Sequence, residues 1–290
     1  MSFSYGGQAL IEGVLIRGRS GVSVAVRIPD GRIVTYTERV NAGSATSLGR
    51  LPFVRGIVGL WGTLSVGTRM LMYSANVASG AIDPDESPPA AINKMLGVSI
   101  GTAVGLFFVL PMVLMQKSSR RIQNPLLASL LEGFVRLGLF MGYLAAISQT
   151  KQIQRVFAYH GAEHKTVHAQ EQGKSLSPEE VQQFPTAHPR CGTAFLLQMM
   201  LLSSVAFAFF GKPSFKKRIL LRVVMAPVLS SISYELLKLG ATGQDNPVTR
   251  ILIGPGLALQ RLTTREPDDA QVEVAIAAMN GALALDAASA

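Results

Sequence analysis

The residues able to do metal chemistry gather in one stretch of this chain. All four histidines and the only cysteine, Cys191, lie between positions 160 and 191. Residues 160–164 read H-x-x-E-H, the inverted zincin motif, in which two imidazoles bind a metal and the glutamate acts as general base. The stretch therefore predicts a divalent metal site, best suited to zinc, with Glu163 as catalytic base. The alternative is a polar helix capped onto a membrane bundle, because histidine and glutamate co-occur by chance on many solvated helices.

Helical spacing would place further polar side chains beside the motif. Residues three and four apart are neighbours on a helix, so one face would carry His160, Glu163, His164, His168 and Glu171. Zinc accepts imidazole nitrogen, carboxylate oxygen and thiolate sulfur, and a catalytic site keeps one position for water. His160 and His164 are the best first two ligands. Spacing leaves the third ligand open among Glu171, His188, Cys191 and Glu235.

Three other residues could support the chemistry without binding the metal. His168 lies one turn beyond the motif and could hydrogen-bond a ligand. Arg190 and Lys165 could stabilise an anionic intermediate, although isolated basic residues are more often anchors at a membrane surface. Gly161 counts against a helix here, because glycine in a helix costs roughly 1 kcal/mol relative to alanine.

The remainder of the chain has the composition of an integral membrane protein. Hydrophobic residues make up 48% and charged residues 16% of the sequence, and the mean hydropathy is +0.32. The net charge of +9 does not indicate nucleic-acid binding, because the basic residues sit beside apolar spans and suit cytoplasmic anchors. The first residues, MSFSYGGQ, lack the features of a signal peptide. We expect a multi-pass protein of the bacterial cytoplasmic (inner) membrane, in contact with lipids.

Four apolar stretches have the length of membrane spans: 95–115, 125–148, 192–211 and 219–239. The second stretch contains Glu132 and Arg136, which are four residues apart. Buried charges in hydrocarbon are costly unless they pair or face the bundle interior. This spacing therefore predicts a structural ion pair, with a polar path to a buried site as the alternative.

The first part of the chain has a different pattern. Residues 22–28 and 32–37 are rich in β-branched residues and flank Pro29-Asp30-Gly31, which predicts a hairpin. The glycine-spaced stretch 5–21 lacks the ending of a phosphate-binding loop and suits close backbone packing. The fold class is thus mainly α, a polytopic helical membrane protein with a small β-containing N-terminal domain.

The chain divides by composition into five parts. Residues 1–53 form the β-containing domain, and 54–80 a glycine-rich helix that either spans or lies in the interface. The linker is 81–93, and the helical membrane domain is 94–264 with its polar His/Cys segment at 149–191. Residues 265–290 form a C-terminal amphipathic helix, with Asp268 and Asp269 near its start.

Charge in the loops bears on orientation. The loops at 116–124 and 212–218 are basic, which places them in the cytoplasm and the histidine segment on the opposite side. An unpaired cysteine favours the reverse arrangement, since a cytoplasmic thiol stays reduced easily. The sequence leaves both arrangements open.

Several segments together resemble the bacterial YqhQ family, and the likeness covers nearly the whole chain. They are 6-GGQALIEGVLIRG-18, 159-YHGAEHKTVHAQEQG-173, 188-HPRCGT-193, 232-ISYELLKLG-240 and 262-LTTREPDDAQVEVAIAA-278. This resemblance implies a membrane protein of the kind described as predicted metal-dependent enzymes. By position, it also implies importance for the family's signature residues: Glu12, Arg17, His160, Glu163, His164, Glu171, His188, Arg190, Cys191 and Glu235.

Three functions are compatible with the sequence. The first is a metal-dependent membrane hydrolase whose substrate, such as a peptide or lipid-linked group, reaches the membrane interface. The second is a membrane assembly factor whose polar cluster is a docking surface or a structural metal site. The third is a metal carrier with a path along Glu132, Arg136 and Glu235. A catalytic site needs an open coordination position, a structural site is closed, and a carrier needs ligands within its spans.

Overall fold

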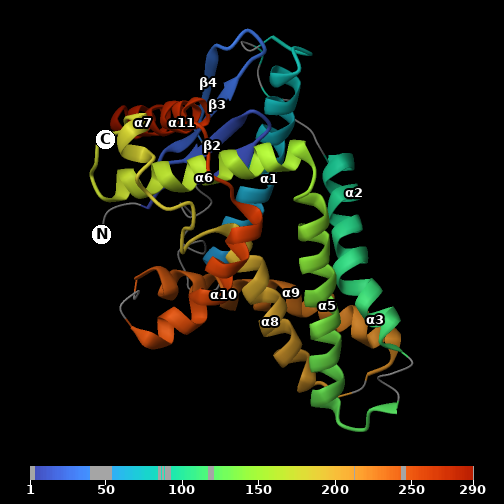
Figure 1. The fold of residues 1–290 in the computed structure, drawn as a ribbon. Helices are drawn as coiled ribbons and strands as arrows, with labels where there is room; N and C mark the ends of the chain where they lie inside the picture. Colours follow the sequence, from blue (N-terminus) through green and yellow to red (C-terminus); the bar gives the residue numbers. More distant parts are fainter. Residues whose placement is uncertain are drawn as a thin grey trace.

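A four-stranded antiparallel sheet begins the chain, and the later elements are helices (Figure 1). The computed structural model describes residues 4–39, 54–83, 86, 88, 93–116, 121–211, 213–242 and 246–289. The strands are β1 (Gly6–Leu10), β2 (Gly13–Arg17), β3 (Gly21–Arg27) and β4 (Ile33–Arg39). The helices are α1 (Val54–Ala78), α2 (Asn93–Val104), the π-helix η3 (Gly105–Val109), α3 (Leu110–Leu114), α5 (Pro125–Ile147), α6 (Lys151–Glu171), α7 (Pro178–Val181), α8 (Gly192–Ala208), α9 (Phe215–Thr242), α10 (Pro247–Thr263) and α11 (Asp269–Ala287). The predicted fold class is confirmed.

The sheet is a simple meander in the order β1-β2-β3-β4. The predicted hairpin is β3 and β4, and Gly31 takes a φ of +90° in its turn. The stretch before it, interpreted from sequence as close-packed glycine-rich backbone, is a second hairpin of β1 and β2. Its turn places Glu12 at a φ of 51°, a left-handed conformation that is uncommon for a residue other than glycine.

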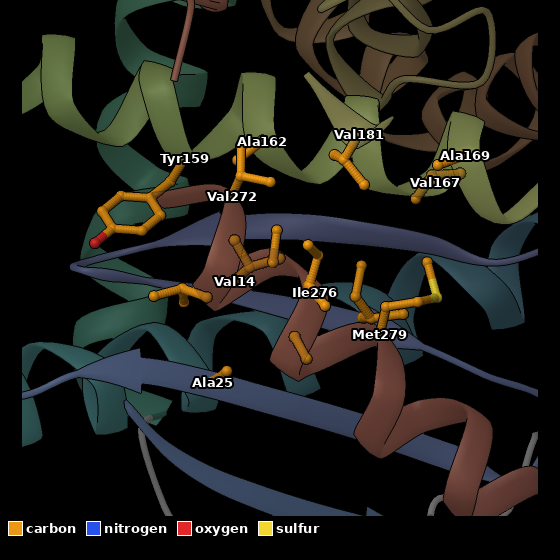
Figure 2. Close-up of a cluster of buried hydrophobic side chains, with 14 of the residues drawn as sticks. Val14, Ala25, Tyr159, Ala162, Val167, Ala169, Val181, Val272, Ile276 and Met279 are labelled. Carbon is orange, nitrogen blue, oxygen red and sulfur yellow. The ribbon is translucent and has the colours of Figure 1, made fainter. Parts of the chain in front are cut away.

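Both faces of the sheet are covered, which explains why β2 and β3 are almost continuously buried. On one face, Leu15 and Val24 pack against Met70 and Tyr73 of α1. On the other face, a second apolar cluster joins the sheet to α6, α7 and α11 (Figure 2). Its labelled members are Val14, Ala25, Tyr159, Ala162, Val167, Ala169, Val181, Val272, Ile276 and Met279.

The C-terminal helix α11 completes the sheet domain. A capping box begins it, with Asp268 and Gln271 each hydrogen-bonded to the other's backbone. Near its end, Gly281 lies against Ser23 of β3, where a Cβ would stand 2.2 Å from the serine hydroxyl. The sheet near the start of the chain and the helix near its end therefore form one domain, although composition divides 1–53 and 265–290 into separate parts.

The remaining helices form the apolar bundle. Three helices in the described ranges are long and apolar enough to cross a membrane: Gly97–Leu114, Pro125–Ile147 and Phe215–Gly240. The predicted span at 192–211 is the shorter apolar helix Gly192–Ala208. Gly133 in the first half of α5 faces Ser204 in the second half of α8, and the later residues Phe140 and Leu144 cluster with the earlier Leu197 and Met200, so these two helices run antiparallel. The start of α5 and the end of α8 therefore lie at the same end of the bundle, opposite α6 (Figure 1).

Two further helices are α1, whose placement the sequence left open, and α10. The second half of α1 buries Tyr73 and Val77 against the sheet, and α1 is not among the three candidate spans of the described residues. Helix α10 continues through Pro255 and the two glycines beside it, and Gly256 packs against α8, where a Cβ would stand 2.5 Å from Ala194 Cβ. Most of the linker at 81–93 lies outside the described residues.

Candidate metal centre

Helix α6 holds the H-x-x-E-H motif below the sheet. The Thr150 side chain caps its start, and Gly173, with a φ of +64°, follows its end. Gly161 has a positive reason to be glycine, because a Cβ there would lie 2.1 Å from the carbonyl oxygen of Arg265. The missing side chain thus lets the segment between α10 and α11 approach the motif, and Arg265 N–H donates to Phe157 O over 2.9 Å.

His160, His164 and Cys191 form the first ligand group. One ligand atom from each lies within 4.8 Å of the other two, and Cys191 Sγ is 3.3 Å from His160 Nε2. Bond lengths to zinc of about 2.0 Å for nitrogen and 2.3 Å for sulfur place tetrahedral ligand atoms about 3.5 Å apart. The spacing in this group therefore suits a zinc ion. Cys191 and His164 are buried, while His160 is partly exposed.

Backbone carbonyls fix the orientation of both imidazoles. Nδ1 of His160 lies 2.8 Å from Thr263 O, and Nδ1 of His164 lies 2.6 Å from Thr186 O. A carbonyl oxygen only accepts, so each Nδ1 carries the proton and each Nε2 keeps its lone pair. This arrangement is typical of histidine ligands in metal sites. Burial also lowers the pKa of His164 below its ordinary value of 6.5, which favours the neutral, ligating form.

Glu163 lies beside this group and outside it. Its Oε2 is 3.6 Å from His164 Nε2, and its side chain is 6% exposed. The side chain packs against β1, where a Cβ on Gly7 would stand 2.8 Å from Glu163 Cγ. Burial raises the pKa of Glu163, while His160, His188 and the backbone of Gly7 oppose that rise. A buried carboxyl with a raised pKa suits proton transfer near neutral pH.

A second group contains His168, Glu171 and His188, whose ligand atoms also lie within 4.8 Å of one another. Its geometry is less suited to metal. Arg190 contacts the Glu171 carboxylate, and His188 Nε2 lies 3.4 Å from the same side chain. His188 Nδ1 accepts from Arg190 N–H over 3.3 Å, so both of its ring nitrogens are engaged. Burial lowers the pKa of His168 to about 4.

The two signature residues of the first hairpin lie apart from the ligand groups. Glu12 accepts from Arg155 Nη2 over 2.6 Å and from the Tyr159 hydroxyl over 3.2 Å, so it ties the first hairpin to α6. Arg17 ends β2 and points toward α1, 3.9 Å from where a Cβ of Gly62 would lie. Glu12 therefore positions the motif helix, and Arg17 packs elsewhere.

Glu235 and Lys165, named from the sequence as a ligand and an anion stabiliser, lie outside the first group as well. Glu235 belongs to α9 and to neither ligand group found among the described residues. Lys165 donates to Gln182 O over 2.8 Å and lies 2.9 Å from Glu266. Lys165 thus fastens α6 to its neighbours.

The sequence interpretation missed the groups that hold the ligand loop. Gln260 of α10 is fully buried and clamps His188 from both sides, accepting from its N–H over 2.7 Å and donating to its carbonyl over 2.9 Å. The carbonyls of Thr186 and Thr263 orient the imidazoles. Residue spacing cannot predict such backbone contacts. Gln260 could have been noticed from the sequence, because it is a single glutamine among the apolar residues of its helix.

Comparison with known proteins places the chain in a family. Residues 51–285 match the family described as "Protein of unknown function (DUF1385)". The chain is also 35% identical to the "Uncharacterized protein YqhQ" of Bacillus subtilis (strain 168), over 99% of this chain and 94% of that protein. No solved structure matches. The chain therefore belongs to the DUF1385 family and is a relative of YqhQ, and the resemblance noted from its motifs is confirmed.

Proposed function

We propose that this DUF1385 chain is an integral membrane metal-dependent hydrolase of the bacterial cytoplasmic membrane. One observation carries the proposal: two imidazoles with Nδ1 fixed on backbone carbonyls meet a cysteine on the face of α6 that also bears a buried glutamate. Three protein ligands leave the fourth tetrahedral position for water, which is the pattern of catalytic rather than structural zinc sites.

The residues of the chain divide the chemistry among them. His160, His164 and Cys191 would hold the ion, and zinc in such a set lowers the pKa of bound water toward 7. Glu163, beside His164, accepts the proton of the attacking water and passes it to the leaving group. His160 is the partly exposed member of the group, so the substrate approaches from its side. Arg190 lies close enough for its positive charge to act on Glu163, although it is paired with Glu171.

The position of α6 indicates the class of substrate. The helix lies outside the three candidate spans and follows α5 directly, so it sits at one end of the apolar bundle (Figure 1). A peptide or a lipid-linked group that emerges at the membrane interface would meet the site there. This placement disfavours a metal carrier, because neither ligand group among the described residues lies within a candidate span.

Glu163→Gln tests the catalytic role. The amide keeps the shape of the side chain and cannot accept a proton, so bound zinc should stay near the wild-type level while activity drops about 10²–10⁴-fold. Metal content of the purified protein and complementation of a strain lacking the chromosomal copy provide the two readouts. Full complementation by Glu163→Gln would contradict the hydrolase proposal and would favour a scaffold protein with a structural metal site.

A further inference from the structure

Three arginines surround a single carboxylate inside the helical bundle, far from α6. Arg136 of α5 lies 3.3 Å from Glu132, and Arg218 and Arg222 of α9 both contact the same carboxylate. The Glu132 and Arg136 side chains are only 3% and 2% exposed. Three positive charges against one negative charge leave a net charge of +2. Buried charge without compensation is costly, so this cluster calls for an anion.

The cluster also holds more hydrogen-bond donors than acceptors. Each guanidinium carries five N–H groups, whereas one carboxylate offers about four lone-pair sites. Ser203 Oγ accepts from Arg136 over 2.5 Å, and Phe108 O accepts from Arg222 over 2.7 Å. Nε of Arg136 is buried and has no hydrogen-bond partner among the described residues. A pair that served only to join helices would need one arginine, not three.

A cavity opens beside these donors. Its lining includes Ser129, Arg136, Ser204, Phe207, Arg218 and Arg222, and it offers about 30 Å³ to a water-sized group. A single water molecule needs about 10–15 Å³ of such space, so the cavity can hold two oxygen atoms of an anion. The serines and guanidiniums suit phosphoryl oxygens, which arginine binds through two parallel hydrogen bonds.

The depth of the cavity points to a lipid rather than to a solute. Both α5 and α9 are candidate membrane spans. At 1.5 Å per residue, Arg218 and Arg222 lie about 5 and 10 Å from the start of α9. The 26-residue span Phe215–Gly240 is about 39 Å long, close to the 40–45 Å of a bilayer with its headgroups, so these two depths bracket the boundary between the headgroups and the hydrocarbon.

We propose that this cavity binds the phosphate of a lipid phosphomonoester. A phosphomonoester carries about −1.5 to −2 charges at neutral pH, which balances the net +2 of the cluster. A phosphodiester lipid carries one negative charge and would leave the cluster positive. The site therefore discriminates by headgroup charge, and it is distinct from the histidine–cysteine centre at the other end of the bundle.

The test measures binding of short-chain lipids to the full chain purified in detergent. Dioctanoyl phosphatidate should bind about tenfold or more tightly than dioctanoyl phosphatidylglycerol or phosphatidylcholine. Arg218→Gln should weaken phosphatidate binding about 10- to 100-fold, the usual cost of a hydrogen bond to a charged group. The matched control is Lys217→Gln, which removes the same charge next to Arg218 from an exposed site and should change affinity little.

A second variant guards against loss of folding. Ser129→Leu fills the cavity and keeps all four charged residues of the cluster, so it should abolish the phosphatidate preference without removing an ion pair. The proposal is overturned if phosphatidylcholine binds as tightly as phosphatidate, or if Lys217→Gln is as harmful as Arg218→Gln. Equally tight binding of inorganic phosphate in phosphatidylcholine would overturn the lipid assignment and leave a site for the free anion.

Discussion

The Glu163 side chain lies against the backbone of Gly7, so a Cβ on Gly7 would stand 2.8 Å from Glu163 Cγ. The first strand of the sheet thus forms one wall around the proposed general base, although 156 positions separate the two residues (163 − 7). Gly7 thereby allows β1 to pack closely against the proposed catalytic residue of α6. The sheet domain and the candidate site are one structural unit.

Gly7→Ala should reduce both stability and function. The added methyl would meet Leu15 O at 2.4 Å and displace Glu163, so we expect a loss of about 1–3 kcal/mol in the free energy of unfolding from overpacking. Thermal unfolding and complementation measure the two effects. Gly6→Ala is the matched control, because nothing lies within 4 Å of its added Cβ. Equal behaviour of the two variants would show that the close approach is unimportant.

Glu132→Ala should destabilise the protein more than Arg136→Ala. The carboxylate is shared by Arg136, Arg218 and Arg222, so its removal leaves three buried or half-buried cations unbalanced. Breaking a buried ion pair typically costs about 3–5 kcal/mol. Removing Arg136 as well should not restore stability, in contrast to the isolated pair that the sequence predicts. Accumulation in membranes and melting in detergent are the measurements, and recovery in the double variant would contradict the shared carboxylate.

Asp286 should fasten the end of α11 to the turn between β2 and β3. It accepts from Arg19 N over 2.9 Å, Ser20 N over 2.7 Å and the Tyr5 hydroxyl over 2.9 Å. Burial by itself raises the pKa of Asp286, but these hydrogen bonds outweigh it and lower the pKa below the ordinary 3.8. The stabilisation is therefore complete well above pH 3.8 and is lost as pH falls through the lowered folded-state pKa.

Asp286→Asn should consequently lower the free energy of unfolding by about 1–3 kcal/mol at neutral pH. The difference from wild type should shrink as pH falls below 3.8, where the wild-type carboxylate also takes up a proton. Chemical unfolding at a series of pH values measures this. A difference that does not change with pH would show that the charge of Asp286 plays no part.

Local patterns in the sequence predicted a large part of this fold. The β3–β4 hairpin was predicted because it rests on turn residues close in the chain. The end of α6 at Gly173 and the Ser177 cap of α7 follow equally local rules. The β1–β2 hairpin was missed. Its turn relies on Glu12 in a left-handed conformation that turn rules assign to glycine, and a long-range contact with Arg155 of α6 accompanies it.

The sequence predicted which residue types form the candidate site, but it left open which residue joins His160 and His164 as the third ligand. Periodicity placed His160 and His164 on one face of a helix, but it carried no information on where the 185–191 loop folds back. That return depends on Gln260 holding His188 and on the absence of a side chain at Gly161, both tertiary effects. The three-dimensional arrangement favours Cys191 over Glu171 as the third ligand, because Arg190 occupies the Glu171 carboxylate.

Cobalt substitution tests the centre most directly, since a thiolate bound to Co²⁺ gives a charge-transfer absorption band in the near ultraviolet. The wild-type chain should bind about one ion and show this band. His160→Ala and His164→Ala should lose the ion, and Cys191→Ser should lose the band, because serine is a poor substitute for a soft sulfur donor. Glu171→Gln should keep both. A wild-type protein without bound ion or band, or a band that survives Cys191→Ser, would contradict the proposed histidine–cysteine centre.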